Sequence, residues 1–458
     1  MKKILPTLAL SLTLSACGTL DYFSDSTEEK LEGDRLSITD FEKSLQSNSQ
    51  TKFGMDDGEA KSNVITLSDV VGGTDAAMQL DAPWTNKFWP QVGGYPTHAM
   101  KNLSFTNDEP KRVWSSSIGA GGTKRMPLTS APIMADDKVF TMNNDAEIVT
   151  FDANNGKKLW ERDILKPSED EVVIGGGLAF SGGQLFATNG FNEVIALDPK
   201  NGSILWRADT KTPIRAAPSA MPGRVIVTTM ANETIALNSK TGERLWSHRG
   251  LSSDAGLLGA STPALTRDAV ITAYSSGEIY ALQIDTGLEL WSTNLSSLSR
   301  VSGQSSISDI QALPVVADGV VYAASSKNRM HAIDIRTGQT KWQVALGTKT
   351  TPWISGNRLF VVDAQGTLVS LDNESGNALW QTDLEQFDGD NRIRWVGPIL
   401  TNNQLLIIGS HGEAQAYNPK DGSLLNTWDI DDDVMLAPAL AQETLYLLSD
   451  NGRLRAYR

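Results

Sequence analysis

Side chains that could hold a metal ion or carry out catalysis are few in this 458-residue chain and lie far apart. Four histidines occur, none at metal-ligand spacing from another, and we expect each at a turn or on a strand surface: His98, His248, His331 and His411. The acidic runs 388–391 and 431–433 lack the alternating oxygen series of a calcium loop, so we expect solvated surface there. The glycine-rich stretch 119–124 lacks the Gly-Lys-Ser/Thr ending of a phosphate loop. The sequence therefore offers no catalytic, metal or cofactor site.

The only cysteine, Cys17, carries a more specific prediction. It follows two lysines, an apolar run over residues 5–14 that is too short to span a bilayer, and the tripeptide Leu-Ser-Ala. This arrangement resembles a bacterial lipobox, in which the signal peptide, here 1–16, is removed and the cysteine is lipidated. We expect acyl chains on Cys17 to anchor the mature chain in a membrane. Because Gly18 follows rather than aspartate, we expect sorting to the outer membrane.

A pattern of strand, tight turn and strand, Ala-x-Asp-x-x-Thr-Gly-x-x-x-Trp with small substitutions, recurs along the chain. In six copies a tryptophan follows the turn glycine by four residues; a seventh copy keeps its turn at Gly422, but its tryptophan is displaced by two residues. One further tryptophan precedes the first copy in register. A period of 38 to 51 residues indicates a repeat architecture in which each tryptophan packs between neighbouring units. The repeat tryptophans are Trp114, Trp160, Trp206, Trp246, Trp291, Trp342, Trp380 and Trp428.

Each unit reads as four short antiparallel strands, which is one blade of a β-propeller. The unit that begins at Pro314 has a proline-headed strand, an Asp-Gly turn, two further strands and the tryptophan strand. Eight such starts occur, but the last unit, 438–458, holds only three strands. Residues 111–116 supply the missing one. The sequence thus predicts an all-β, eight-bladed propeller of four-stranded antiparallel blades, whose last blade is closed by the N-terminal strand, with no open sheet edge at the closure.

Three segments are expected after the signal peptide. Residues 17–80 form an acidic flexible tether, since 19–80 hold 13 acidic against 5 basic residues. Residues 81–110 form an aromatic lead-in segment that packs on the propeller, which occupies 111–458. The formal net charge of −14 argues against nucleic acid as a partner.

The repeat resembles that of pyrroloquinoline-quinone-type propellers, which include quinone dehydrogenases and non-enzymatic relatives. More specifically, the chain is similar to the BamB family, lipoproteins of the outer-membrane β-barrel assembly machinery. The resemblance covers the lipobox, the tether and all eight blades. The most similar stretches are 308–322, 355–363 and the ending 452–458, and 89–98 looks like the lead-in of the longer family members.

The resemblance implies a non-enzymatic scaffold that faces the periplasm from the outer membrane, held by its N-terminal lipid anchor. In the family, two loops between blades bind the POTRA domains of the barrel-inserting protein BamA. The resemblance also implies other barrel-assembly subunits as partners. In the first loop, Leu257 matches a family leucine and Leu258 stands where the family has an arginine. In the second, Asp309 matches an aspartate and Gln311 replaces another. Independently of the family, adjacent leucines in a Ser/Gly-rich connection and the long connection 292–311 indicate binding loops.

Two alternatives stay open. One is a periplasmic dehydrogenase that holds pyrroloquinoline quinone and calcium on the propeller axis, although the family's adjacent-cysteine pair is missing here. The other is a propeller that binds a periplasmic polymer such as peptidoglycan, which the acidic surface disfavours for anionic polymers. We expect the scaffold, with no cofactor.

Overall fold

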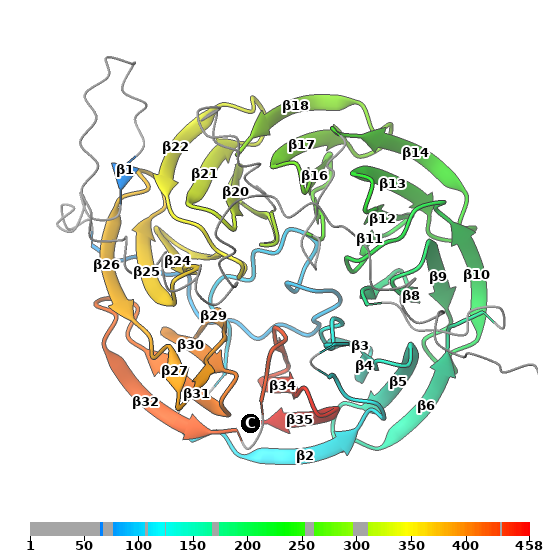
Figure 1. Cartoon of the computed structure of the whole chain (residues 1–458), viewed down its shortest axis with the longest axis horizontal. Coiled ribbons are helices and arrows are strands. Elements are labelled where there is room, and N and C mark those ends of the chain that lie inside the picture. Colours follow the sequence, from blue (N-terminus) through cyan, green and yellow to red (C-terminus); the bar gives the residue numbers. More distant parts are fainter. Residues whose placement is uncertain are drawn as a thin grey trace, which may run out of the picture. The chain divides into compact units, whose positions relative to one another are not determined.

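A computed structural model describes most of the chain as a ring of β-sheets around an axis (Figure 1). The described residues are 65–66 (backbone only), 77–105, 109–123, 125–166, 174–251, 261–295, 310–430 and 433–458. The expected signal peptide, Cys17 and most of the expected tether lie outside them. No helix within the described ranges has the length and apolar character needed to cross a bilayer.

Eight four-stranded antiparallel blades make up the ring, so the predicted fold is confirmed. Blade 1 consists of β3 (Ile133–Ala135), β4 (Lys138–Met142), β5 (Glu147–Asp152) and β6 (Lys158–Asp163). Blade 2 consists of β7 (Gly177–Ser181), β8 (Gln184–Thr188), β9 (Glu193–Leu197) and β10 (Ile204–Asp209), and blade 3 of β11 (Ser219–Met221), β12 (Arg224–Thr228), β13 (Glu233–Asn238) and β14 (Arg244–Arg249). Blade 4 consists of β15 (Ala264–Leu265), β16 (Ala269–Ala273), β17 (Glu278–Gln283) and β18 (Glu289–Asn294).

The second half of the ring repeats this order. Blade 5 consists of β19 (Val315–Ala317), β20 (Val320–Ser325), β21 (Arg329–Asp334) and β22 (Thr340–Ala345), and blade 6 of β23 (Trp353–Ser355), β24 (Arg358–Val362), β25 (Thr367–Asp372) and β26 (Ala378–Asp383). Blade 7 consists of β29 (Trp395–Thr401), β30 (Gln404–Gly409), β31 (Glu413–Tyr417) and β32 (Leu424–Asp429). Blade 8 consists of β33 (Ala439–Ala441), β34 (Thr444–Leu448), β35 (Arg453–Tyr457) and β2 (Arg112–Ser117). A short parallel strand, β1 (Ile65–Thr66), adds to β22, and a hairpin of β27 (Phe387–Asp388) and β28 (Asn391–Arg392) follows blade 6.

The strand nearest the axis in each blade is called the inner strand here, and the fourth is called the outer strand. In six blades the inner strand begins one residue after a proline, which has no N–H to contribute to a ladder and suits the first position of a strand. Blade 2 begins at Gly177 instead, and in blade 7 Pro398 lies within β29. The third strand is buried on both faces, as in β9, whereas the outer strands carry exposed residues. The core therefore lies between blades.

The ring closes as predicted, because β2 pairs antiparallel with β35. In this pairing Trp114 lies opposite Ala456, just as Trp160 lies opposite Thr150 inside blade 1. The closing pair ends with two backbone bonds, from Lys111 N to the Arg458 carbonyl at 2.7 Å and from Arg458 N to the Lys111 carbonyl at 3.0 Å. The first strand of the propeller and the last residues of the chain thus form one sheet.

At seven of the eight junctions, the repeat tryptophan of one blade packs on the turn glycine of the next blade. In seven junctions the indole Nε1 donates to a backbone carbonyl of that turn over 2.7 to 3.0 Å. Each glycine has φ between 70° and 76°, and a Cβ atom there would meet the indole at 2.5 to 2.7 Å. Only glycine combines this left-handed conformation with such a close approach. The pairs are Trp114–Gly156, Trp160–Gly202, Trp206–Gly242, Trp246–Gly287, Trp291–Gly338, Trp342–Gly376 and Trp380–Gly422.

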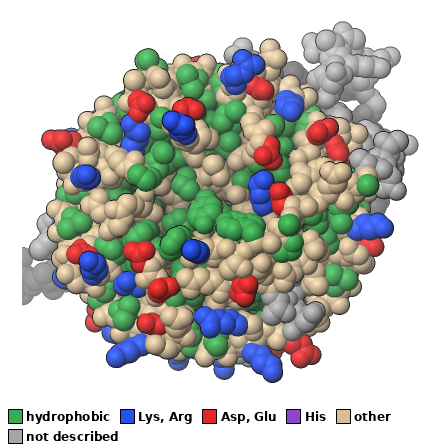
Figure 2. Space-filling model, turned by 180° about the vertical axis from the view of Figure 1, so that it is seen from behind, with side chains coloured by type: hydrophobic (Ala, Val, Ile, Leu, Met, Phe, Trp, Pro, Cys, Tyr) green, Lys and Arg blue, Asp and Glu red, His purple; other side chains and the backbone are tan. Residues whose placement is uncertain are grey.

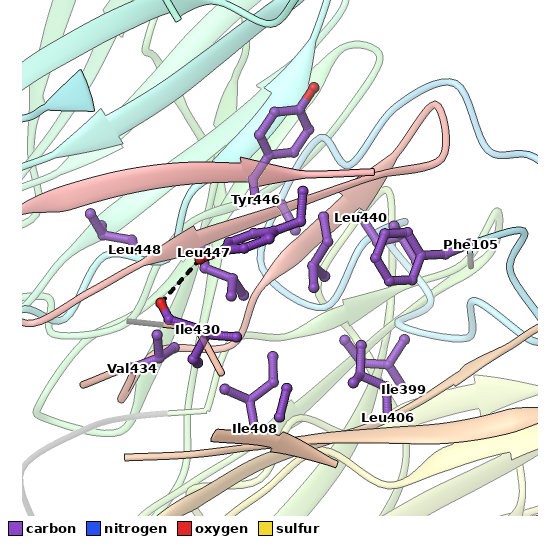
Figure 3. Packing of buried hydrophobic residues seen from close by; sticks show 14 of the residues in the cluster. Phe105, Ile399, Leu406, Ile408, Ile430, Val434, Leu440, Tyr446, Leu447 and Leu448 are labelled. Carbon is purple, nitrogen blue, oxygen red and sulfur yellow. Dashed lines mark hydrogen bonds between the residues drawn. The ribbon is translucent and has the colours of Figure 1, made fainter. Parts of the chain in front are cut away.

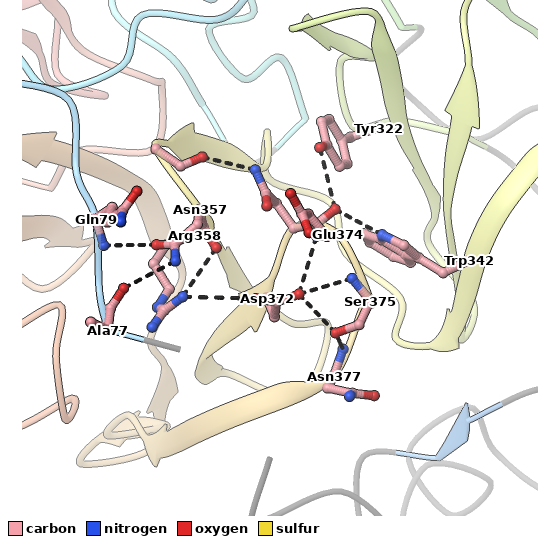
Figure 4. Close-up of polar contacts among 12 residues, drawn as sticks. Ala77, Gln79, Tyr322, Trp342, Asn357, Arg358, Asp372, Glu374, Ser375 and Asn377 are labelled. Atoms are coloured by element: carbon pink, nitrogen blue, oxygen red, sulfur yellow. Dashed lines mark hydrogen bonds and ion pairs between the residues drawn. The ribbon is translucent and has the colours of Figure 1, made fainter. Parts of the chain in front are cut away.

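Figure 4 shows this contact, called the tryptophan latch below, between blades 5 and 6. Trp342 Nε1 donates to the Asn373 carbonyl over 2.9 Å, and the Tyr322 hydroxyl reaches the same oxygen at 3.5 Å. The Asp372 carboxylate caps the turn by accepting from Ser375 N at 2.9 Å and Ser375 Oγ at 2.8 Å. Asx capping and the glycine hold the turn in the shape that the indole needs.

The junction between blades 7 and 8 lacks the latch. Asn426 occupies the usual tryptophan position opposite Ala416, while Trp428 lies two residues further on, opposite Ala414. The buried Trp428 Nε1 has no hydrogen-bond partner among the described residues. Blade 8 has no β35–β2 turn to receive an indole, because its outer strand comes from the other end of the propeller.

A different contact joins these two blades. The Tyr457 hydroxyl donates to the Ile430 carbonyl over 3.0 Å, in a cluster of aliphatic residues and Phe105 (Figure 3). Blade 7 provides Ile399, Leu406 and Ile408 to this cluster, with further residues from blade 8. Apolar packing and one tyrosine therefore replace the latch where the turn is missing.

The expected lead-in segment is 81–110; from here on, the name lead-in is used for the continuous described residues 77–105. These residues run once around the axis against the inner strands (Figure 1). The circuit starts at blade 6, where Asn357 N donates to the Gln79 carbonyl over 2.9 Å. It then passes blade 8, where Gln442 N donates to the Asn86 carbonyl, and blade 1, where Trp89 and Met134 exchange two backbone bonds of 2.7 and 2.8 Å.

The second half of the circuit completes the contacts with all eight blades. Blades 2 and 3 bond to Pro90 and Gln91, through Phe180 N at 2.7 Å and Ala220 N at 3.0 Å. Leu265 N of blade 4 donates to the Pro96 carbonyl, and Val316 N of blade 5 to Thr97. Lys101 accepts from Trp353 of blade 6, and Leu103 bonds to Leu400 of blade 7. A single segment thus ties together inner strands that are far apart in sequence.

We predict that Gly376→Ala lowers stability by about 2–4 kcal/mol, because the new Cβ would lie 2.6 Å from Trp342 and the left-handed backbone would also be strained. The matched control is Gly389→Ala, where φ is +58° and no atom lies within 4 Å of the added Cβ. Its cost should be about 1 kcal/mol from the backbone alone. Urea denaturation of the two variants measures the difference, and equal midpoints would contradict a latch at this turn.

Candidate partner-binding site

Three of the four residues predicted to bind a partner lie outside the described residues. Leu257 and Leu258 belong to the undescribed connection 252–260, and Asp309 to the undescribed connection 296–309. Gln311 is described. The structure does describe the residues that flank both connections, called the stems here: Leu251 and Ser261 for the first, and Leu295 and Ile310 for the second.

The first connection follows β14 of blade 3 and the second follows β18 of blade 4, and the starts of both are bonded to blade 4 where β17 begins. The Glu278 carboxylate accepts from Leu251 N over 2.9 Å, which holds the start of the first connection. Leu295 N donates to the Gly277 carbonyl over 2.8 Å, which holds the start of the second. Residues that follow two different blades are therefore bonded to two consecutive residues, Gly277 and Glu278.

The far ends of the connections also meet. Ser261 Oγ donates to the Ala312 carbonyl over 3.0 Å in a buried contact. Ile310 is almost fully buried, and Leu295 packs in the same apolar cluster. A loop whose two ends are fixed loses less conformational entropy when it binds a partner. The two predicted binding loops thus start together and end together.

A polar network supports the first stem from blade 3. The Asn232 side chain, in a turn with φ +54°, donates to the Leu251 carbonyl over 2.8 Å and accepts from Ser275 Oγ at 3.0 Å. Gly250 N donates to the Asn232 carbonyl, and a Cβ on Gly250 would lie 2.4 Å from the Tyr274 ring. Neither Asn232 nor Glu278 is singled out by the sequence, where an asparagine in a tight turn is the only signal.

Aromatic rings form the floor under this stem. The His248 ring lies 4.6 Å from that of Tyr280, and its Nδ1 lies 3.2 Å from the Tyr274 hydroxyl. Burial lowers the pKa of His248 and raises the pKa of Tyr280 to about 12, so both groups are neutral near pH 7. The floor is uncharged and well packed.

Apolar side chains are exposed beside the stems. Leu251 is 63% exposed, and Met230 in the neighbouring turn of blade 3 is 45% exposed. Figure 2 shows one face of the ring, on which hydrophobic side chains gather toward the middle and charged side chains are scattered around the periphery. Exposed apolar groups on a rigid scaffold are typical of protein-binding surfaces.

Gln311 lies beside the propeller axis. It is half-buried and lines a cavity of about 240 Å³ together with His98 and Leu313. A second cavity, of about 290 Å³, lies across Val92 and Leu313. Of the four residues predicted to bind a partner, Gln311 alone belongs to the described part of the chain, and the prediction for the other three stays a prediction.

The histidine expectation is wrong for His331, a buried residue of β21, whereas His98 lies at a turn as expected, closed by the bond from its N to the Tyr95 carbonyl. His98 and His331 are buried, and desolvation lowers the pKa of each to about 4. His98 Nδ1 lies 2.8 Å from the Pro314 carbonyl, so the lead-in makes this histidine part of the core. His411 packs edge-on against Trp395 at 5.3 Å. The acidic run 388–391 lies in the exposed β27–β28 hairpin, as expected.

The residues of the axis do not fit the calcium ion of quinone dehydrogenases. No carboxylate lines either axial cavity, and no group of three metal-ligating side chains occurs among the described residues. Calcium is held by six to eight oxygen ligands, carboxylates among them. We therefore derive no chemistry through such a group.

Comparison with known proteins decides the family. A family model described as outer membrane protein assembly factor BamB matches residues 102–175, 144–382 and 364–458. The chain belongs to the BamB family. The outer membrane protein assembly factor BamB of Yersinia pestis is 26% identical over 356 residues, which cover 76% of this chain and 88% of that protein. The family prediction is confirmed.

Solved structures of BamB and of dehydrogenases share the fold. BamB from Moraxella catarrhalis aligns with a TM-score of 0.64 at 18% identity, covering 76% of this chain and 100% of that one. Quinohemoprotein alcohol dehydrogenase from Comamonas testosteroni aligns with a TM-score of 0.64 at 13% identity, covering 84% and 81%. Identities this low show the propeller fold alone, so the likeness to a dehydrogenase carries no activity.

We predict that titration of His331 lowers the stability of the folded chain as the pH is lowered. Its pKa is about 4 in the folded chain against about 6.5 when unfolded, because burial and the nearby Arg329 charge disfavour protonation. The unfolded state therefore binds the proton first, and stability is lost as pH falls from about 6.5 to about 4, by up to about 3 kcal/mol.

The matched variant is His331→Phe, which keeps an aromatic ring but cannot titrate. Denaturation midpoints should diverge as pH falls through this window, with the wild type losing more, while His98 and the carboxylates contribute equally to both proteins. Parallel pH profiles would show that His331 does not titrate in this range.

Proposed function

We propose that this chain is a non-enzymatic scaffold of the outer-membrane β-barrel assembly machinery. The observation that carries the proposal is the match of the BamB family model along residues 102–458, together with relatives that are named assembly factors. The chain would sit at the outer membrane, anchored through Cys17 and facing the periplasm. It would bind the POTRA domains of BamA and contact other barrel-assembly subunits, but not nucleic acid.

The proposed contact is made by the connections 252–260 and 296–309. Leu257 and Leu258 would bury apolar surface against a POTRA domain, and Asp309 would contribute a charge near the same place. Gln311 would act at the base of the second connection. The meeting of the stems on blade 4 supports this proposal, because one partner domain could contact both loops without moving either.

The test is a crosslinked pull-down of the tagged full-length protein from detergent-solubilised membranes. Wild type should recover BamA, and the double variant Leu257→Asp, Asp309→Arg should recover at least about tenfold less, because it buries a charge and reverses another. The matched control is Leu425→Asp, Asp390→Arg, which makes the same changes at exposed positions on and beside blade 7.

Each outcome is informative. Loss with the first double variant alone supports both the role and the face. Equal recovery by all three proteins would keep the role and reject the face. Absence of BamA from every lane, with wild type folded and lipidated, would overturn the scaffold proposal.

We further predict that Glu278→Ala weakens binding to purified POTRA domains about five- to tenfold without unfolding the ring. The carboxylate holds Leu251 N and Ser276 Oγ, so its removal frees the start of the first loop and adds an ordering cost of about 1 kcal/mol. Glu147→Ala is the control, because Glu147 occupies the same place in blade 1 and holds only Asn143. Equal affinities for both variants would show that the stem does not position the loop.

A further inference from the structure

The two cavities on the propeller axis form a second candidate site, separate from the loops of blade 4. One has a volume of about 240 Å³ and the other about 290 Å³, and they share Val92 and Leu313 in their walls. Val92 belongs to the lead-in, which forms one side of both cavities, and residues within or just before the inner strands form the rest of the described lining. Together the cavities approach the size of ordinary small-molecule sites.

The walls are mainly apolar. Trp89 and Trp353, both nearly fully buried, line the first cavity, and Leu128 and Leu178 line the second. Apolar cavities of this size gain little from ordered water, because a water molecule needs two to four polar partners. The walls would therefore favour a hydrocarbon or aromatic group.

The charges at the cavities have one sign. Arg215 lines the second cavity and Lys349 the first, and the lining residues include no aspartate or glutamate, although the chain has 54 acidic and 40 basic residues. Because the charged residues in the described lining are both cations, the cavities favour an anionic group, although the protein as a whole is acidic. Repulsion from distant carboxylates is screened beyond about 8 Å at physiological salt.

The backbone of Arg215 is held in place, and its guanidinium has no counter-charge among the described residues. Its carbonyl accepts from Gly176 N over 2.9 Å, and a Cβ on Gly175 would lie 2.9 Å from the Arg215 Cα, so the two glycines allow the close approach. Its guanidinium forms no ion pair or hydrogen bond with any residue that the structure describes, and Nε is buried. Guanidinium is the side-chain group best matched to a carboxylate, through two parallel hydrogen bonds.

One further polar atom belongs to this region. His98 lines the first cavity and its Nδ1 contacts the Pro314 carbonyl, so Nδ1 carries the proton and Nε2 is an acceptor. Nε2 is buried without a partner among the described residues. Among the described residues, the cavities thus contain a cation and an acceptor that have no partner, within apolar walls.

We propose that the axial cavities bind a small amphiphilic anion, an aliphatic or aromatic group that carries a single carboxylate. The carboxylate pairs with Arg215 and the apolar body fills the space beside Val92 and Leu313. A cation would be repelled by Arg215 and Lys349, and a neutral hydrocarbon would leave the guanidinium unpaired. A free acyl carboxylate and the C-terminus of a polypeptide with an apolar last residue share this chemistry.

Isothermal titration calorimetry of the full-length protein tests the proposal with two probe pairs. The first is octanoate against octanol, and the second is N-acetyl-leucyl-phenylalanine as the free acid against its C-terminal amide. At least one carboxylate should bind saturably, and about tenfold more tightly than its uncharged analogue. The pair with the tighter carboxylate identifies the source of the ligand.

Variants assign the binding to the cavities. Arg215→Gln should weaken the carboxylate at least about fivefold and leave the uncharged analogue unchanged, whereas Arg267→Gln, an exposed arginine in the β15–β16 turn, should change neither. Leu436→Trp fills the second cavity and should weaken both members of a pair. Thermal unfolding confirms that each variant is folded.

Three results would overturn the proposal: no saturable binding of either carboxylate, equal binding of charged and uncharged probes, or binding that Arg215→Gln and Leu436→Trp leave unchanged. None of these results bears on recovery of BamA, so the proposal stands or falls independently of the scaffold role.

Discussion

The contact between an indole and the turn glycine of the next blade is the interaction on which the rest of this structure depends. A blade is only four strands wide and cannot bury both of its faces alone. The indole covers the junction, and its Nε1 supplies a partner for a turn carbonyl that would otherwise be buried unpaired. Each buried tryptophan contributes about 2–3 kcal/mol from apolar area, so seven repeats make the latch a major share of the stability of the ring.

A ring that closes by strand pairing must join two distant parts of its chain, and here the constraint shows at one junction. The outer strand of blade 8 comes from residues 112–117, so this blade lacks the turn that would receive Trp428. Tyr457 and the aliphatic cluster around Ile430 provide the contact instead. The lead-in then ties together the inner strands, including those of blades 7 and 8, from inside the ring. The junction without the latch is therefore supported by two other sets of contacts.

The rigid ring explains how a protein without an evident catalytic site can present two different surfaces. On blade 4, the turn between β16 and β17 holds the starts of both undescribed connections, so the proposed partner would meet loops with fixed ends. On the axis, the lead-in forms one side of two cavities, and the charged residues among their described lining are Arg215 and Lys349. The two surfaces share the scaffold and one residue with an assigned role, Gln311, which follows the second connection and lines the first cavity.

The sequence by itself determined the blade count, the turn glycines, the tryptophan positions and the closing strand. These follow from short-range chemistry: an Asx cap, a glycine at positive φ and an indole four residues later are all read within one repeat. It did not reveal that each glycine serves the tryptophan of the preceding blade, because that contact spans about one whole repeat. Only the tertiary structure decided the circuit of the lead-in, the burial of His98 and His331, and the meeting of Ser261 with Ala312. The tertiary structure also decided the place of Arg215 in an apolar cavity, without a partner for its guanidinium among the described residues. In each case residues far apart in the chain become neighbours only when the ring closes, and no local pattern records such a contact.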